Sequence, residues 1–268
     1  MENVIDYYSH FDEWGRLDRE PLEFIMNWHY MKQYLPPCGN VLDNGSGPGK
    51  YSMELAKQGL TVTLSDITPR LVEIAKEKAS ELGLTEYFNG FHVLNATNLD
   101  GLPNEFFDAS LMLGPLYHLQ REEERINAVR ELFRVTKKEG IIFVAFQSRM
   151  RMTITSLQFP QYWKPNDTMD SINEFCSTGI FNHADQGRFT GAYYFNVDEI
   201  KPFMESHGFE TMDLIGSSSI GGMLNNEQKQ FWEEKGESRK LMNLLIEKAK
   251  DPSVLGISSH LLYIGRRK

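Results

Sequence analysis

The chain has 268 residues, of which 41% are hydrophobic and 24% are charged, and this composition excludes a disordered or fibrous protein. Its 28 basic and 37 acidic residues give a net charge of −9. Because Lys and Arg are dispersed along the chain, we expect no nucleic-acid partner. Cys38 and Cys176 form no CxxC pair, so the sequence indicates neither a disulfide framework nor a structural zinc site.

The first residues are acidic and lack the apolar stretch of a signal peptide. The longest apolar run, residues 141–146, is too short to span a bilayer. We therefore expect a cytoplasmic protein with no membrane partner.

From Val41 onward, short apolar runs alternate with helical patterns, an order typical of a parallel sheet with helices on both faces. Helical periodicity is clearest in residues 69–82 and 122–133, and a polar helical segment is expected over 225–250. Thr68 with Pro69, and Asn196 with Glu199, are predicted helix starts. The predicted strands are residues 41–42, 60–64, 91–94, 106–113, 141–146, 209–215 and 261–264.

Residues 148–194 interrupt this alternation without a clear periodicity. The segment is longer than a connection between neighbouring elements usually is. We expect it to form a cap over a site, together with residues 216–258. Aromatic side chains of the cap, among them Tyr193 and Tyr194, are candidates for substrate contact, and the alternative is that they form the core of the cap itself.

The most informative stretch is a strand that ends in a glycine-rich loop, Asp43-Asn44-Gly45-Ser46-Gly47-Pro48-Gly49, followed by a helix. Glycines allow the sharp turn and let a ligand approach the backbone closely. The G-x-G-x-G spacing differs from the G-x-G-x-x-G of dinucleotide-binding folds, which weakens an NAD-dependent oxidoreductase as the interpretation. Asp66 ends the second predicted strand, where a carboxylate can accept both hydroxyls of a ribose.

The loop, Asp43, Asp66 and the alternating elements together resemble the class I S-adenosylmethionine-dependent methyltransferases, in particular the small-molecule branch of types 11 and 25. The resemblance is strongest over residues 41–146. It implies one α/β domain over 1–268, with a Rossmann-like sheet of seven mostly parallel strands, helices on both faces and an antiparallel last strand. It also implies that residues 1–40 form a helical segment over the cofactor and that the cap is built from insertions.

By the same resemblance, the cofactor is S-adenosylmethionine, the product is S-adenosylhomocysteine, and no metal is needed. Asp43 is expected near the amino group of the cofactor, Asp66 at the ribose and Ile67 against the adenine. The expected cofactor contacts are Tyr8, Arg16, Asp43, Gly45, Ser46, Gly47, Gly49, Asp66, Ile67, Asn95, Ala96, Thr97, Leu113 and Gly114.

The expected substrate contacts are Tyr117, His118, Tyr193 and Tyr194, and His118 is the candidate catalytic residue. A base titrating near pH 6 to 7 would help a hydroxyl acceptor, whereas a neutral amine would not need it. The alternative for His118 is a cap or a packed ring.

The predicted activity is in-line transfer of a methyl group to nitrogen or oxygen of a small molecule or a small peptide-like natural product, by a monomer or homodimer. The sequence has no Asn-Pro-Pro-Tyr run, which argues against enzymes that methylate amino groups of nucleobases or glutamine. Two alternatives stay open: a non-catalytic S-adenosylmethionine sensor and an NAD-dependent oxidoreductase with a variant glycine loop.

Overall fold

A computed structural model describes residues 2–10, 13–15, 21–184 and 191–268. Seven strands form one sheet in the order β3-β2-β1-β4-β5-β9-β8. They are β1 (Asn40–Asn44), β2 (Thr61–Asp66), β3 (Phe88–Val93), β4 (Phe107–Met112), β5 (Thr136–Gln147), β8 (Phe209–Gly216) and β9 (His260–Arg267).

The five strands from β3 to β5 pair in parallel, and β9 runs antiparallel to both β5 and β8. The predicted seven-stranded, mostly parallel sheet with an antiparallel last strand is confirmed. The order of the strands reverses between β1 and β4, and in such sheets ligands bind beyond the carboxyl ends of the strands at this position.

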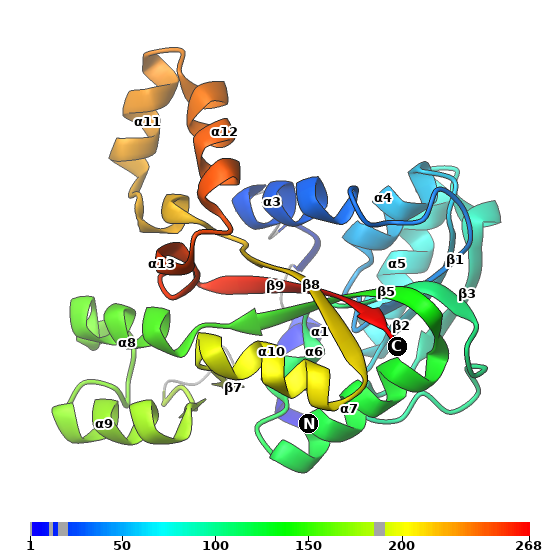
Figure 1. The fold of residues 1–268 in the computed structure, drawn as a ribbon, viewed down its shortest axis with the longest axis horizontal. Coiled ribbons are helices and arrows are strands. Elements are labelled where there is room, and N and C mark those ends of the chain that lie inside the picture. The colour runs from blue at the N-terminus through cyan, green and yellow to red at the C-terminus, as the bar shows by residue number, and fades with distance from the viewer. Residues whose placement is uncertain (1, 11–12, 16–20, 185–190) are drawn as a thin grey trace.

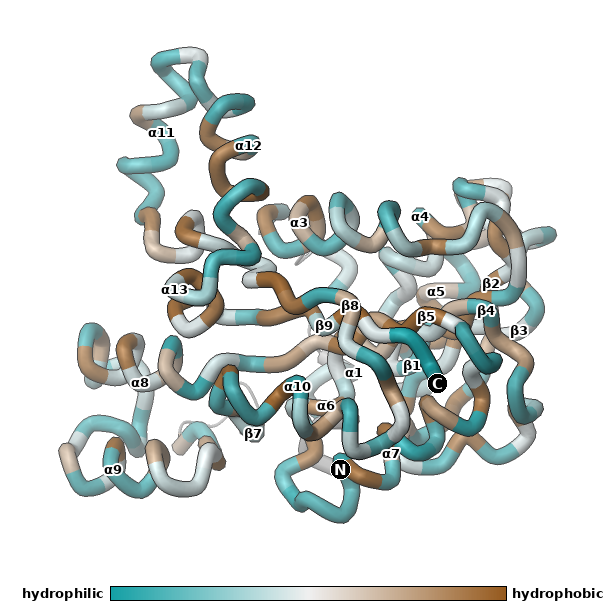
Figure 2. The backbone as a smooth tube through the Cα atoms, viewed as in Figure 1, coloured by the Kyte–Doolittle hydropathy of each residue, from teal (hydrophilic) through white to brown (hydrophobic). Residues whose placement is uncertain are grey.

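Helices cover both faces of the sheet (Figure 1). On one face, buried residues of α3 (Pro21–Met31), α4 (Lys50–Lys57) and α5 (Pro69–Glu81) share a hydrophobic cluster with the strands. On the other face, α7 (Glu122–Val135) and α10 (Val197–Ser206) do the same. Figure 2 shows hydrophobic stretches in the strands and a largely hydrophilic α11.

Local sequence signals explain several helix starts. Pro69 is at the first position of α5, as predicted, although Thr68 makes no capping hydrogen bond through its side chain. Asn196 and Glu199 form a capping box at the start of α10, which satisfies backbone N–H groups that the helix itself leaves without partners.

Residues 148–194 contain more regular structure than the sequence pattern indicated. The segment holds α8 (Arg149–Gln158), α9 (Met169–Thr178) and a short hairpin of β6 (Ile180–Phe181) and β7 (Ala192–Tyr193). Ser148 and Thr168 cap the two helices by accepting backbone N–H groups. The helices are short and their apolar residues form a small core of their own, so the sequence carries no long amphipathic repeat.

The remaining helices among the described residues are α1 (Glu2–His10), α6 (Pro115–His118), α11 (Asn226–Glu234), α12 (Ser238–Lys248) and α13 (Pro252–Leu255), with 3-10 turns at Thr85–Tyr87, Pro160–Tyr162 and Ile220–Met223. The predicted segment 225–250 is therefore two helices, which project from the body of the molecule (Figure 1). Among the described residues, no helix has the length and apolarity needed to cross a bilayer.

Candidate functional site

The glycine-rich loop joins β1 to α4 at the carboxyl edge of the sheet. Gly47 has a left-handed backbone with φ of 58°, and a Cβ added there would have Glu13 Cγ, at 3.4 Å, as its nearest neighbour. Gly49 is also left-handed, but its Cβ would come within 2.8 Å of Leu64 Cδ1. Gly47 therefore leaves room for a ligand, whereas Gly49 is needed for packing against β2.

Asp66, at the end of β2, braces this loop. One carboxylate oxygen accepts the backbone N–H of Gly47 and the other accepts that of Thr68, each at 2.8 Å. The residue is 7% exposed. Burial raises the pKa of the Asp66 carboxyl, and the two backbone N–H groups act in the opposite direction by stabilising the anion.

Asp43, at the end of β1, is more deeply buried. Its carboxylate accepts a hydrogen bond of 2.6 Å from Ser52 Oγ, on the following helix. Burial is the main cause that raises the pKa of Asp43 to about 6, and the nearby charge of Asp66 adds to it. Two carboxylates from adjacent strands thus stand beside the loop.

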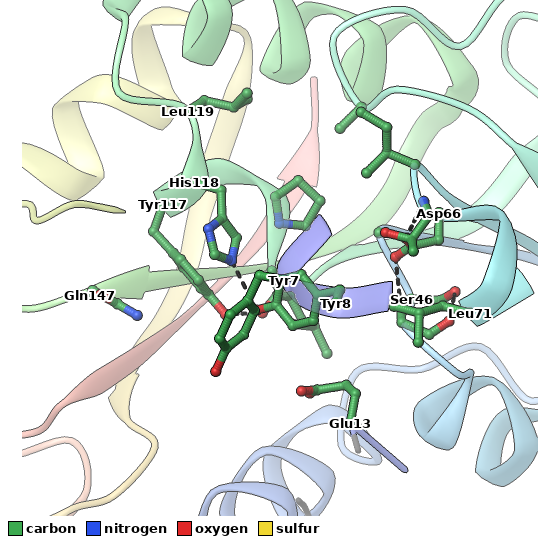
Figure 3. Close-up of a pocket in the computed structure, with 18 of the residues that line it drawn as sticks. Tyr7, Tyr8, Glu13, Ser46, Asp66, Leu71, Tyr117, His118, Leu119 and Gln147 are labelled. Atoms are coloured by element: carbon green, nitrogen blue, oxygen red, sulfur yellow. Dashed lines mark hydrogen bonds between the residues drawn. The ribbon is translucent and has the colours of Figure 1, made fainter. Parts of the chain in front are cut away.

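A cavity of about 780 Å³ lies at this edge of the sheet (Figure 3). Asp66 and Ser46 are on one side of it, and Tyr117, His118 and Gln147 are on the other. The volume is within the range of about 300–1,000 Å³ typical of small-molecule sites. The predicted residues that line it are Tyr8, Asp43, Gly45, Ser46, Gly47, Asp66, Ile67, Asn95, Ala96, Leu113, Gly114, Tyr117, His118 and Tyr194.

Three other predicted residues do not line the cavity. Gly49 packs against β2, and the backbone N–H of Thr97 donates to Asn95 Oδ1 at 3.1 Å. The ring of Tyr193 lies under the guanidinium of Arg125, 3.6 Å from the ring centroid. The last prediction, Arg16, falls outside the described residues.

His118 lies on the far side of the cavity from Asp66, and its Nε2 is 3.1 Å from the hydroxyl of Tyr8. Burial is the main cause that lowers the pKa of His118 to about 4, and His260 acts in the same direction when its ring is protonated. This pKa lies below the range of 6 to 7 expected if His118 acts as a base on a hydroxyl acceptor. In this desolvated position, the neutral ring is favoured over the cation.

The N-terminal helix α1 contributes Tyr7 and Tyr8 to the lining of the cavity, and Glu13 follows shortly after. Arg70 fastens α1 to the body by donating to the carbonyl oxygen of Ser9 at 2.5 Å. The ring of Trp14 lies 5.2 Å from Lys50 Nζ.

Two parts of the predicted cap differ in their relation to the cavity. Segment 148–194 contributes Trp163, Asn182, Gly191 and Tyr194 to the lining, whereas Phe175 and Phe181 are buried in the cluster between α8, α9 and the hairpin. None of the residues 216–258, all of them described, is among those that line the cavity.

The lining residues that sequence reasoning missed include Glu23 on α3, Gln147 at the end of β5 and His260 at the start of β9. The antiparallel register of β5 and β9 places Gln147 opposite His260. Because 113 positions separate the two residues, no local motif could have linked them.

The part of the chain that the structure describes contains no cluster of three or more His, Cys, Asp or Glu side chains suited to a metal ion. Both cysteines are free thiols at exposed positions.

A family model described as a methyltransferase domain matches residues 42–144, which hold the loop, Asp43 and Asp66. This match supports a class I S-adenosylmethionine-dependent methyltransferase domain in this part of the chain. Among the relatives, YqeM of Bacillus subtilis is 24% identical over 146 residues, 54% of this chain and 56% of its own length. The tRNA (carboxymethyluridine(34)-5-O)-methyltransferase of Arabidopsis thaliana is 32% identical over 114 residues, 41% of this chain and 24% of that protein.

Solved structures agree in fold. The Burkholderia thailandensis 1,6-didemethyltoxoflavin-N1-methyltransferase, solved with bound 1,6-didemethyltoxoflavin and S-adenosylhomocysteine, has a TM-score of 0.57 at 15% identity, covering 100% of this chain and 86% of that one. At this identity the likeness establishes the methyltransferase fold. The match to the curated relatives spans about half the length of YqeM and a quarter of the Arabidopsis protein.

Proposed function

We propose that this protein transfers a methyl group from S-adenosylmethionine to nitrogen or oxygen of a small molecule. The observation that carries the proposal is that one continuous cavity extends from the loop braced by Asp66 to the polar and aromatic residues around His118 (Figure 3). One ligand can contact the loop while a second approaches from the other end.

The residues present fit the cofactor. Gly47 gives it access to the backbone, and Asp66 retains lone pairs on both oxygens for the two ribose hydroxyls. Ile67 and Ala96 offer apolar contacts for the adenine, and Asp43 offers a negative charge for the amino group. When bound, the cofactor supplies an electrophilic methyl group on a sulfonium.

The contribution of the chain to the reaction is orientation. Residues of the loop and of the segment after β4 hold the two reactants in line within a partly closed cavity. The lone pair of the nucleophile would form the new bond to carbon, the electron pair of the carbon–sulfur bond would stay on sulfur, and the acceptor would then lose its N–H or O–H proton to water. His118, with its lowered pKa of about 4, is a poor proton acceptor at neutral pH and serves to position Tyr8 and the acceptor.

We propose a small acceptor because the site is lined by aromatic rings and because acids exceed bases in the chain as a whole. We further propose that residues 1–40 cover the cofactor and that residues 148–194 determine which acceptor enters. The tRNA methyltransferases among the relatives favour one second candidate, an RNA acceptor. A protein with a net charge of −9 and dispersed basic residues would bind that polyanion poorly.

Two measurements test the proposal. Calorimetry should detect binding of S-adenosylhomocysteine and no binding of NAD. If folded protein does not bind S-adenosylhomocysteine, the proposal is contradicted. Transfer of tritium from the methyl group of S-adenosylmethionine into a small-molecule extract, and not into total tRNA, separates the two acceptor classes. Cofactor binding without transfer into either would indicate a sensor.

A further inference from the structure

Three polar side chains from three elements meet at the end of the cavity away from Asp66. Glu23 Oε2 lies 3.4 Å from His260 Nδ1, and His260 Nε2 lies 3.3 Å from Gln147 Nε2. All three residues line the cavity. They form a chain of contacts from a carboxylate, through an imidazole, to an amide.

The donors and acceptors in this chain leave one consistent arrangement for a neutral imidazole. A carboxylate only accepts, so Glu23 favours the tautomer of His260 with its proton on Nδ1. Nε2 of His260 then carries a lone pair, and the amide nitrogen of Gln147 donates to it. Rotating the amide by half a turn would bring two lone pairs together. The carbonyl oxygen of Gln147 is therefore held on the side away from His260.

This carbonyl oxygen is the second observation. Gln147 is 8% exposed, and its Oε1 has no hydrogen-bond partner among the described residues. Buried polar atoms in folded proteins are nearly always hydrogen-bonded. A buried acceptor atom held next to a cavity is suited to a donor on a bound molecule.

The lining of the cavity indicates what kind of molecule would bring that donor. The rings of Tyr117 and Tyr8 stand around His118, and Tyr117 is also 5.8 Å from the ring of His260. These walls suit a flat ring. Carboxylates outnumber cations among the described residues that line the cavity, with Glu13, Glu23, Asp43, Asp66 and Glu124 against Lys50 and Arg121.

A negatively charged acceptor is disfavoured in this environment. An oxygen nucleophile reacts best after it has lost its proton, whereas a ring nitrogen attacks while neutral. His118 is too weak a base to remove a proton from a hydroxyl at neutral pH, because burial lowers its pKa to about 4. The nucleophile that fits best is therefore a neutral nitrogen.

We propose that Glu23 and His260 hold the amide of Gln147 so that its Oε1 accepts an N–H from the methyl acceptor, and that this acceptor is an uncharged nitrogen heterocycle carrying the N–H beside its nucleophilic nitrogen. The inference rests on the proposed function and adds its substrate class. Gln147 is the binding residue, and Glu23 and His260 are positioning residues.

The test uses matched pairs of acceptors and methyl-tritiated S-adenosylmethionine. Benzimidazole is compared with benzothiazole, and 2-aminopyridine with 2-methylpyridine. In each pair both compounds have the nucleophilic ring nitrogen, and the first compound alone has the neighbouring N–H. We expect the N–H compound of at least one pair to be labelled about 10-fold more efficiently, the scale of one hydrogen bond to a buried group.

Variants then assign the preference to residues. Gln147→Met keeps the size of the side chain and should remove the preference while leaving the affinity for S-adenosylhomocysteine unchanged. Gln158→Met, an exposed position outside the cavity, is the matched control and should behave as wild type. His260→Phe and Glu23→Met, which lacks an oxygen acceptor for His260 Nδ1–H, should raise KM for the N–H compound much more than kcat changes, with KM for its partner unchanged. Structural damage would affect both compounds alike.

Equal or absent labelling within every pair, on protein that binds S-adenosylhomocysteine, would overturn the acceptor class and leave the proposed function standing. A preference that survives in Gln147→Met would overturn the role of this residue. Failure of wild type to bind S-adenosylhomocysteine would overturn both the inference and the proposed function.

Discussion

The backbone N–H of Gly47 donates to Oδ2 of Asp66 at 2.8 Å, so the carboxylate at the end of β2 is part of the glycine-rich loop as well as of the cavity wall. From the sequence, the only role suggested for Asp66 was to bind the ribose. The structure adds a bracing role, because Oδ1 of the same side chain also accepts the N–H of Thr68. A change at Asp66 should therefore affect the ligand both directly and through the loop.

We expect Asp66→Ala to weaken binding of S-adenosylhomocysteine by about 10- to 150-fold, which corresponds to the loss of roughly 1.5–3 kcal/mol for a hydrogen bond to a charged group. Calorimetry measures this change in affinity. Asp108→Asn is a matched control, because Asp108 also accepts a backbone N–H, from Asn40, but does not line the cavity. Unchanged affinity in Asp66→Ala would place the ribose elsewhere.

Gly47→Val should abolish binding of the cofactor and leave the sheet folded. The branched side chain would occupy the space open to the ligand and strain a backbone with φ of 58°. Gly59→Val controls for the strain, since Gly59 has φ of 83° with nothing within 4 Å of an added Cβ and does not line the cavity. Circular dichroism and a binding titration distinguish the outcomes. Unfolding in Gly47→Val alone would give the loop a mainly structural role.

The sequence was sufficient for the parts of the fold and site that depend on local pattern. The glycines at 45, 47 and 49 and the acids at 43 and 66 lie at strand ends, and parallel strands bring such ends to one edge. The features of the site that the sequence did not predict depend on packing between residues far apart in the chain. Gln147 lies opposite His260 because of the register between β5 and β9. The pKa of His118 depends on the burial of its ring, which cannot be read from the sequence.

The ionised carboxylate of Asp43 should lower the free energy of unfolding at neutral pH, compared with an uncharged side chain at the same position. Burial raises the pKa of its carboxyl from 3.8 to about 6, so the folded state favours the protonated acid. This contribution to the free energy of unfolding is fully present below about pH 4 and is lost as the pH rises through 6. The shift of the pKa corresponds to about 3 kcal/mol at most.

We therefore expect Asp43→Asn to be more stable than wild type at pH 7 and nearly equal to it at pH 4. Its amide oxygen can still accept the hydrogen bond that Ser52 donates to the carboxylate in wild type. Urea unfolding from pH 4 to pH 7 gives the difference. The same variant should bind S-adenosylmethionine more weakly, a trade between stability and function. A variant less stable than wild type at pH 7 would show that ionised Asp43 stabilises the fold.

The last prediction concerns the protonation of His118. Its pKa is lowered to about 4, mainly by burial, so the ring should be neutral from pH 8 down to about pH 5. Because the folded state favours the neutral ring, this residue contributes stability above its usual pKa, and the contribution is lost as the pH falls from about 6.5 toward 4.

Ring-proton chemical shifts of His118, assigned by comparison with His118→Asn, should stay constant until the pH drops below about 5. Methyl transfer should accordingly show no step near pH 6 to 7 that disappears in His118→Asn. Tyr8→Phe removes the hydroxyl that lies 3.1 Å from Nε2 and should lower affinity for the acceptor without creating such a step. A midpoint between pH 6 and 7 in the chemical shifts, matched by a step in the rate, would restore His118 as a general base.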